Sequence, residues 1–418
     1  MSLAGVSLLL LAAVIAIGFW KKVNLGILSI FVAVLFGLVL GVKDGEIIKG
    51  FSSNLFIMLL GITLLCSIAE VNGSVSLFAQ KCTALIGHKK WLAPIMIWLI
   101  GAVISGAGPG SIPSLGIVCA IAAPFGTATG YNPIMMCVIG EIGIFFGRFT
   151  PITTDCSVIA SYALPQGYNQ FSLPLLKIAL VVSILESLFV FILFKGYKVK
   201  SSFTEEKLVL PAFTKPQLLT LIGFAVLVVT VLGWRRNVGL IGFSVSSLLI
   251  LLGTANEKKV IAKVPWGTLL MITGVGILMQ LVVKAGGIAL LVNGLSAIMT
   301  PRTAPAIIGA MAGIMSWFSS ATGVVFPTMI PMVSGLVKNM GGQVSPDVLI
   351  SMISVCAAYA GLSPASTGGA LILAASSEEN GISADKESYL FAKLFAVSAG
   401  ALLLIVLLAF TGFMDLLV

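Results

Sequence analysis

Two stretches of small and hydroxylated residues interrupt an otherwise apolar chain, and their residue types suit the binding of ions. The first is GAVISGAGPGSIPSL at 101–115, and the second is GIMSWFSSATGVVFPTMIP at 313–331. Because proline lacks a backbone N–H and glycine weakens helices, we expect no continuous helix through either stretch. A helix that begins after such a break offers free N–H groups to an anion, and hydroxyl oxygens suit a hard cation. Each stretch therefore predicts the tip of a re-entrant hairpin and a binding site.

Two further breaks carry the same kinds of residue, GRFTPITTD at 147–155 and GLSPASTGG at 361–369. We expect tips and breaks to meet near the middle of the membrane, because each tip ends arms too short to span it. The residues expected to bind the substrate are Gly108, Gly110, Ser111, Arg148, Thr153, Thr154, Asp155, Ser320, Ser366 and Thr367. The oxygens expected to bind cations belong to Ser105, Thr150, Ser319, Thr322 and Ser363.

Ionisable residues within the apolar segments are few, and such residues are functional by default in a membrane. Glu141, Arg148 and Asp155 follow one another at intervals of seven residues. One interpretation gives Arg148 a substrate carboxylate and gives Asp155 a sodium ion or a proton. The other makes the charges an internal network that fixes the broken helix. Glu186 is interpreted as a partner of Lys177 or as an interface residue.

The composition identifies the protein as an all-α polytopic membrane protein. Of its 418 residues 58% are hydrophobic and 9% are charged, and the mean hydropathy is +1.13. No soluble domain has this balance. The net charge of +9 lies mostly in short loops beside apolar segments, which is typical of membrane topology and not of nucleic-acid binding. With one histidine and no CxxC or HExxH motif, we expect neither an enzyme nor a covalently bound cofactor.

The second half of the chain repeats landmarks of the first at a nearly constant spacing. Gly61 recurs as Gly274 (274 − 61 = 213), and Ser105 recurs as Ser319 (319 − 105 = 214). A constant offset of this kind is the signature of an internal repeat.

Each repeat is expected to hold five spans and one hairpin, and an odd number of spans turns the second repeat upside down. The distribution of lysine and arginine favours both termini outside. The expected units are a first repeat at 1–200 with hairpin 91–126 and broken helix 133–164, a cytoplasmic linker at 201–215, and a second repeat at 216–418 with hairpin 303–338 and broken helix 346–377.

Several of these motifs resemble the malonate/dicarboxylate carrier family. They are LFIMLLGITLL at 55–65, AEVNG at 69–73 and SGAGPG at 105–110. That family belongs to the ion transporter superfamily, alongside the divalent-anion/sodium symporters. The resemblance implies an elevator mechanism, in which a transport domain moves against a scaffold domain that forms a homodimer. It also implies malonate or a C4-dicarboxylate as cargo and sodium as coupling ion.

The sequence thus predicts a secondary active transporter for a small organic anion, coupled to sodium or protons, in a cell membrane such as the bacterial inner membrane. Two alternatives stay open at this point. One is a cation/proton antiporter of the same superfamily that uses Asp155, and the other is an organic-anion exchanger.

Overall fold

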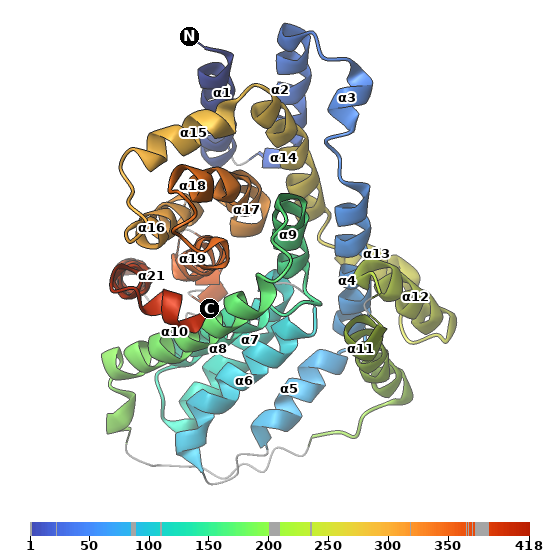
Figure 1. The fold of residues 1–418 in the computed structure, drawn as a ribbon. Coiled ribbons are helices and arrows are strands. Elements are labelled where there is room, and N and C mark those ends of the chain that lie inside the picture. Colours follow the sequence, from blue (N-terminus) through green and yellow to red (C-terminus); the bar gives the residue numbers. More distant parts are fainter. Residues whose placement is uncertain are drawn as a thin grey trace.

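The protein is all-helical in the part of the chain that the structure describes, and it contains no strand there (Figure 1). Among the described residues, five helices are long and apolar enough to cross a membrane, and ten shorter apolar helices accompany them. The predicted class, an all-α multi-pass membrane protein, is confirmed. The computed structural model describes every residue except Met1, Lys22, 85–88, 109–110, 200–209, Arg235, Phe318, Ala365, Thr367, Ala370 and 373–383.

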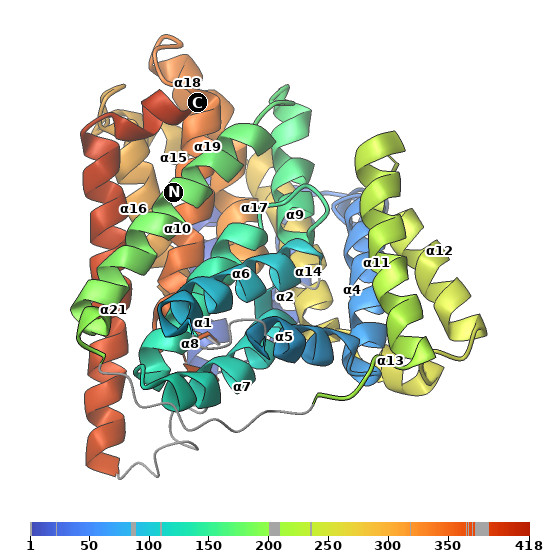
Figure 2. The same ribbon diagram turned by 90° about the horizontal axis from the view of Figure 1, so that it is seen from below.

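One set of helices, here the α4 group, combines the beginning of the chain with the beginning of its second half. Within it α2 packs on α14 and α4 packs on α12, and Figure 2 shows α4, α11 and α12 side by side at one end of the molecule. Its members are α1 (Leu3–Lys21), α2 (Leu25–Leu40), α3 (Asp44–Ile48), α4 (Ser53–Val71), α11 (Lys215–Trp234), α12 (Val238–Leu251), α13 (Glu257–Lys263) and α14 (Trp266–Lys284).

The remaining helices form the α8 group, in which α8 packs on α6, α7 and α10, and α19 packs on α16 and α10. Helices α5 and α15 contact both groups. The members are α5 (Ser74–Ala84), α6 (Ala93–Gly106), α7 (Ser111–Thr129), α8 (Pro133–Gly147), α9 (Thr154–Ala163), α10 (Ser172–Leu193), α15 (Gly287–Ser296), α16 (Ala304–Trp317), α17 (Phe326–Met329), α18 (Val333–Asn339), α19 (Pro346–Tyr359) and α21 (Ala384–Phe410).

The α4 group is joined by two helix crossings at which glycine backbones touch. A Cβ atom on Gly61 of α4 would lie 2.0 Å from the carbonyl oxygen of Gly239 in α12, and one on Gly274 of α14 would lie 2.3 Å from that of Gly26 in α2. Any side chain would therefore separate the helices. The four glycines are related by one spacing, because 239 − 26 = 213 and 274 − 61 = 213.

Two asparagines that cap helices also make equivalent contacts between the two halves of the chain. The Asn24 side chain accepts a hydrogen bond from the Gly26 N–H at the start of α2 and donates one to the Gly267 carbonyl at 2.7 Å. Asn237 caps α12 in the same way and donates to Asn54 Oδ1 at 3.0 Å. Gly267 and Asn54 are again 213 residues apart (267 − 54 = 213). Each half of the chain thus holds the other by equivalent contacts.

The second arm of the second hairpin is irregular. It runs through a π-helical turn at Ala321–Val325, α17, a 3₁₀ turn at Ile330–Met332 and α18. Pro331 interrupts its helical hydrogen bonds. The Gln166 side chain binds the arm beside this 3₁₀ turn, where its Nε2 donates to the Ile330 carbonyl at 3.0 Å and its Oε1 accepts from the Ser334 N–H at 3.0 Å.

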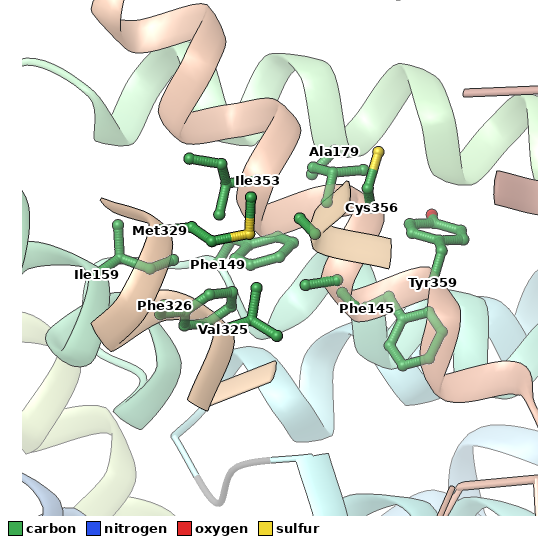
Figure 3. Close-up of a cluster of buried hydrophobic side chains, with 14 of the residues drawn as sticks. Phe145, Phe149, Ile159, Ala179, Val325, Phe326, Met329, Ile353, Cys356 and Tyr359 are labelled. Atoms are coloured by element: carbon green, nitrogen blue, oxygen red, sulfur yellow. The ribbon is translucent and has the colours of Figure 1, made fainter. Parts of the chain in front are cut away.

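A buried aromatic cluster joins the first broken helix to the second half of the chain. Figure 3 shows Phe145 and Phe149 beside Phe326 of the second hairpin and Tyr359 of α19. The rings of Phe145 and Tyr359 have centroids 5.1 Å apart, and all four side chains are buried. This packing holds α8, the hairpin and α19 in one body.

Candidate functional site

A cavity of about 400 Å³ lies where the breaks and hairpin tips approach the α4 group. Its walls come from α4 and α14 on one side, and from α7, α8, α9, α19 and the second hairpin on the other. Among the described residues, the ionisable ones that line it are Glu141, Arg148 and Asp155. The cavity is therefore bounded by both groups and is charged.

The chain between α8 and α9 folds back so that Arg148 and Asp155 meet. Arg148 follows the last residue of α8, and Asp155 lies in the first turn of α9. Thr153 caps α9 by accepting from the Cys156 N–H at 3.2 Å, and it donates to the carbonyl oxygens of Arg148 and Thr150. This turn brings together two side chains that a continuous helix would hold about 10 Å apart along its axis.

Arg148 and Asp155 form a buried, bidentate ion pair. Arg148 Nε donates to Asp155 Oδ2 at 3.0 Å, and Nη2 donates to Oδ1 at 2.7 Å. Their side chains are only 5% and 3% exposed. Such paired bonds fix the orientation of the guanidinium as well as balancing its charge.

Thr322 from the tip of the second hairpin completes this network. Its hydroxyl accepts from Arg148 Nη2 at 3.1 Å and donates to Asp155 Oδ1. The network thus links the first break to the opposite hairpin, 167 residues further along the chain. Arg148 Nη1 donates to none of the described residues, so two N–H bonds of the guanidinium stay available to a ligand.

Glu141 is the third charged group of the cavity. It is 2% exposed, and its Oε2 has no hydrogen-bond partner in the described structure. With both carboxylates ionised, the three side chains sum to −1 (one positive and two negative charges). A buried carboxylate with an unpaired oxygen is costly, so this position calls for a proton or a cation.

The structure places eight of the predicted site residues around the cavity and five elsewhere, while two lie outside the described residues. The lining residues are Ser111, Arg148, Thr154, Asp155, Ser319, Ser320, Thr322 and Ser366. Those that do not line it are Ser105, Gly108, Thr150, Thr153 and Ser363. The two outside the described residues are Gly110 and Thr367.

Several of the residues away from the cavity have structural contacts. Thr150 Oγ1 donates to the Gly106 carbonyl at 2.8 Å, which ties the first break to the first tip. Ser105 is buried, and its hydroxyl has no partner among the described residues. Gly108 has φ +122°, and a Cβ there would lie 2.9 Å from Ile62 Cγ2 of α4. The first tip therefore packs directly against the α4 group.

Sequence reasoning did not single out several lining residues of α4, α14 and α16. Thr63 of α4, Thr268 of α14, and Ser316 and Trp317 of α16 all line the cavity. Thr63 and Thr268 lie in ordinary apolar helices, and Ser316 and Trp317 precede the break. No local pattern marks them, since only the packing of the two groups brings them to the site.

A helical membrane protein whose broken helices enclose a buried, charged cavity is a membrane transporter for polar solutes. A sequence-family model described as citrate transporter matches residues 11–356. The chain belongs to this citrate transporter family. The narrower resemblance to the malonate/dicarboxylate carrier family stays a prediction.

The fold is similar to those of two solved transporters. The Alcanivorax borkumensis YdaH transporter has 13% sequence identity and a TM-score of 0.59 over 87% of this chain and 86% of that one. Neisseria gonorrhoeae MtrF, which its structure's title assigns to a class of antimetabolite efflux pumps, has 10% identity and a TM-score of 0.55 over 90% and 84%. At these identities the likeness concerns the fold alone. Comparison with curated protein sequences gives no significant match.

Proposed function

We propose that the protein is a secondary active transporter for small di- or tricarboxylates. The observation that carries the proposal is the buried guanidinium of Arg148, which lines the cavity and keeps Nη1 free of described partners. A guanidinium N–H donates a charge-assisted hydrogen bond to a carboxylate. The family's description makes citrate the first cargo to test, and the motif resemblance makes malonate and C4-dicarboxylates the second.

Charge balance supports coupling to cations. The lining side chains already sum to −1 when ionised, so a dicarboxylate would bring the site to −3. Protons or sodium ions must offset most of this charge, because the cavity is buried within a membrane protein. Glu141 suits a proton, because its Oε2 has no described partner. For sodium we propose hydroxyl oxygens near each tip, those of Ser105 and Thr150 in the first half and those of Ser319, Thr322 and Ser363 in the second.

The exchanged contacts of the α4 group support the proposed inverted repeats. Equivalent glycines and asparagines meet across the two halves at a spacing of 213 residues, as a pseudo-twofold axis requires. We further propose that the α8 group moves as the transport domain, while the α4 group is the scaffold and forms a homodimer. The proposed setting is a bacterial inner membrane with both termini outside.

The ion pair counts against a cation/proton antiporter that relies on Asp155. An exchanging carboxylate must be free to bind its cation, whereas both oxygens of Asp155 accept bonds from Arg148. An antiporter would also leave the free Nη1 of Arg148 without a role.

Uptake of labelled citrate, malonate and succinate into proteoliposomes tests the proposal, with sodium and pH gradients imposed separately. At least one carboxylate should accumulate, a cation gradient should drive it, and Arg148→Gln should abolish it. The matched control is Lys177→Gln, which removes a positive charge from α10 away from the cavity lining and should transport normally. Sodium/proton exchange without transport of any carboxylate would contradict the proposal.

A further inference from the structure

Arg148 has a counter-ion within the protein itself. Both of its bonds to Asp155, at 3.0 and 2.7 Å, are made inside one short stretch of chain. They depend on no bound solute, and Thr322 supports them from the second hairpin. The guanidinium charge is therefore balanced whether or not a carboxylate occupies the cavity.

Among the described lining residues, no other group pairs with Arg148 in this way. Glu141 is the second carboxylate of the lining, yet no ion pair joins it to Arg148 among the described residues. Its Oε2 has no partner there at all. Asp155 thus has a role that Glu141, with the same charge in the same cavity, does not share.

The difference matters for a carrier that must close its site without cargo. A buried cation that loses its only counter-ion is strongly unfavourable. If the substrate carboxylate were the only anion for Arg148, the site could close only when loaded, and the protein would be an obligatory exchanger. An internal counter-ion removes this restriction.

We propose that Asp155 is a permanent counter-ion of Arg148. It lets the empty binding site move from one side of the membrane to the other, so that the protein performs net transport instead of obligatory exchange. This inference rests on the proposed carboxylate transport. The free Nη1 of Arg148 fits it, because cargo can bind there while Nε and Nη2 keep their bonds to Asp155. Asp155 is then a positioning residue as well, since it fixes the plane in which the guanidinium presents Nη1.

The native protein gives the first test in proteoliposomes, with the carboxylate that shows the highest uptake in the panel above. Net uptake into vesicles without internal carboxylate is compared with exchange into vesicles preloaded with the same compound. Net uptake should reach a rate within about threefold of exchange, because no unpaired cation opposes return of the site. Exchange without net uptake would overturn this inference alone. No carboxylate transport in either assay would overturn the proposed function and this inference together.

Two variants then separate the role of Asp155 from a general effect of charge. Asp155→Asn removes the carboxylate that is bonded to Arg148, so net uptake should fall by about tenfold or more beyond any fall in exchange. Glu186→Gln makes the same change of charge at a buried carboxylate of α10 outside the cavity lining, and it should keep the native ratio of net uptake to exchange. Equal losses of both modes in Asp155→Asn would overturn the inference, and would mark Asp155 as a direct ligand of cargo or cation. Size-exclusion profiles establish that the variants fold, and the native comparison decides the matter if Asp155→Asn does not.

Discussion

At the scale of single residues, the site depends on the ion pair that Arg148 and Asp155 form across the turn between α8 and α9. Glu141, Arg148 and Asp155 stand out because they are ionisable within apolar segments. Their spacing of seven suggests a shared helix face, whereas the capping turn at Thr153 folds Asp155 back onto Arg148. Thr322 could not be predicted as their partner, since only tertiary packing brings it there.

The geometry of the Arg148 guanidinium predicts that lysine cannot replace it. A lysine Nζ keeps the charge but cannot hold both oxygens of Asp155 with two nitrogens and also present a third, free nitrogen to cargo. Arg148→Lys should therefore raise the KM for the transported carboxylate by roughly 10- to 150-fold, which corresponds to about 1.5–3 kcal/mol for a charged hydrogen bond. Uptake kinetics in proteoliposomes measure the change. A KM within about twofold of the native value would argue against the carboxylate site at Arg148.

At the scale of helices, the glycine landmarks are visible in the sequence only as markers of a repeat. Their physical role, the contact of two backbones at a crossing, emerges from the packing of α4 on α12 and of α2 on α14.

Gly61→Ala should destabilise the protein by about 1–3 kcal/mol, as overpacking of a close contact does. Thermal unfolding of the purified protein in detergent tests this. Gly294→Ala is the control, because a Cβ at that helical position meets no atom within 4 Å, and it should not lower the melting temperature.

The irregular arm of the second hairpin also depends on one distant side chain. Gln166 accepts from the Ser334 N–H and donates to the Ile330 carbonyl, which also accepts from the Val333 N–H. In an unbroken helix the Ser334 N–H would bond the Ile330 carbonyl instead. Gln166→Leu removes these bonds at similar size, so the amide hydrogen of Ser334 should exchange with solvent faster. Hydrogen exchange of peptides covering 330–336 measures this, with the exposed Gln343 changed to Leu as control. Unchanged exchange after Gln166→Leu would show that the arm is held by other contacts.

At the scale of the whole molecule, composition predicts the membrane class, and the repeat offset predicts which segments correspond. Neither predicts how the two groups meet, because their common surface consists of apolar helix faces that resemble lipid-facing ones. Met271 of α14 packs against Gly323 of the second tip, where an added Cβ would lie 2.9 Å from Met271 Cγ. This is one of the places where the α4 and α8 groups touch.

A disulfide at this contact tests whether the two groups move relative to each other. In a variant without the six native cysteines, Met271→Cys with Gly323→Cys should form a disulfide on oxidation and lose transport, which a reductant should restore. Asn24→Cys with Gly267→Cys cross-links the α4 group within itself and should leave transport active. Full transport by the oxidised Met271→Cys/Gly323→Cys protein would contradict the elevator mechanism.

The reciprocal contacts of the glycines and asparagines have a consequence for how the chain assembles. Gly61 meets Gly239 while Gly274 meets Gly26, which is the arrangement of an isologous interface between two subunits. Each half therefore supplies the surface that the other requires, and a peptide bond between them is not needed to specify the pairing. Residues 1–199 and 215–418, expressed as separate polypeptides in one cell, should co-purify as a complex. Gly61→Ala in the first fragment should weaken that complex, as a substitution in a dimer interface would.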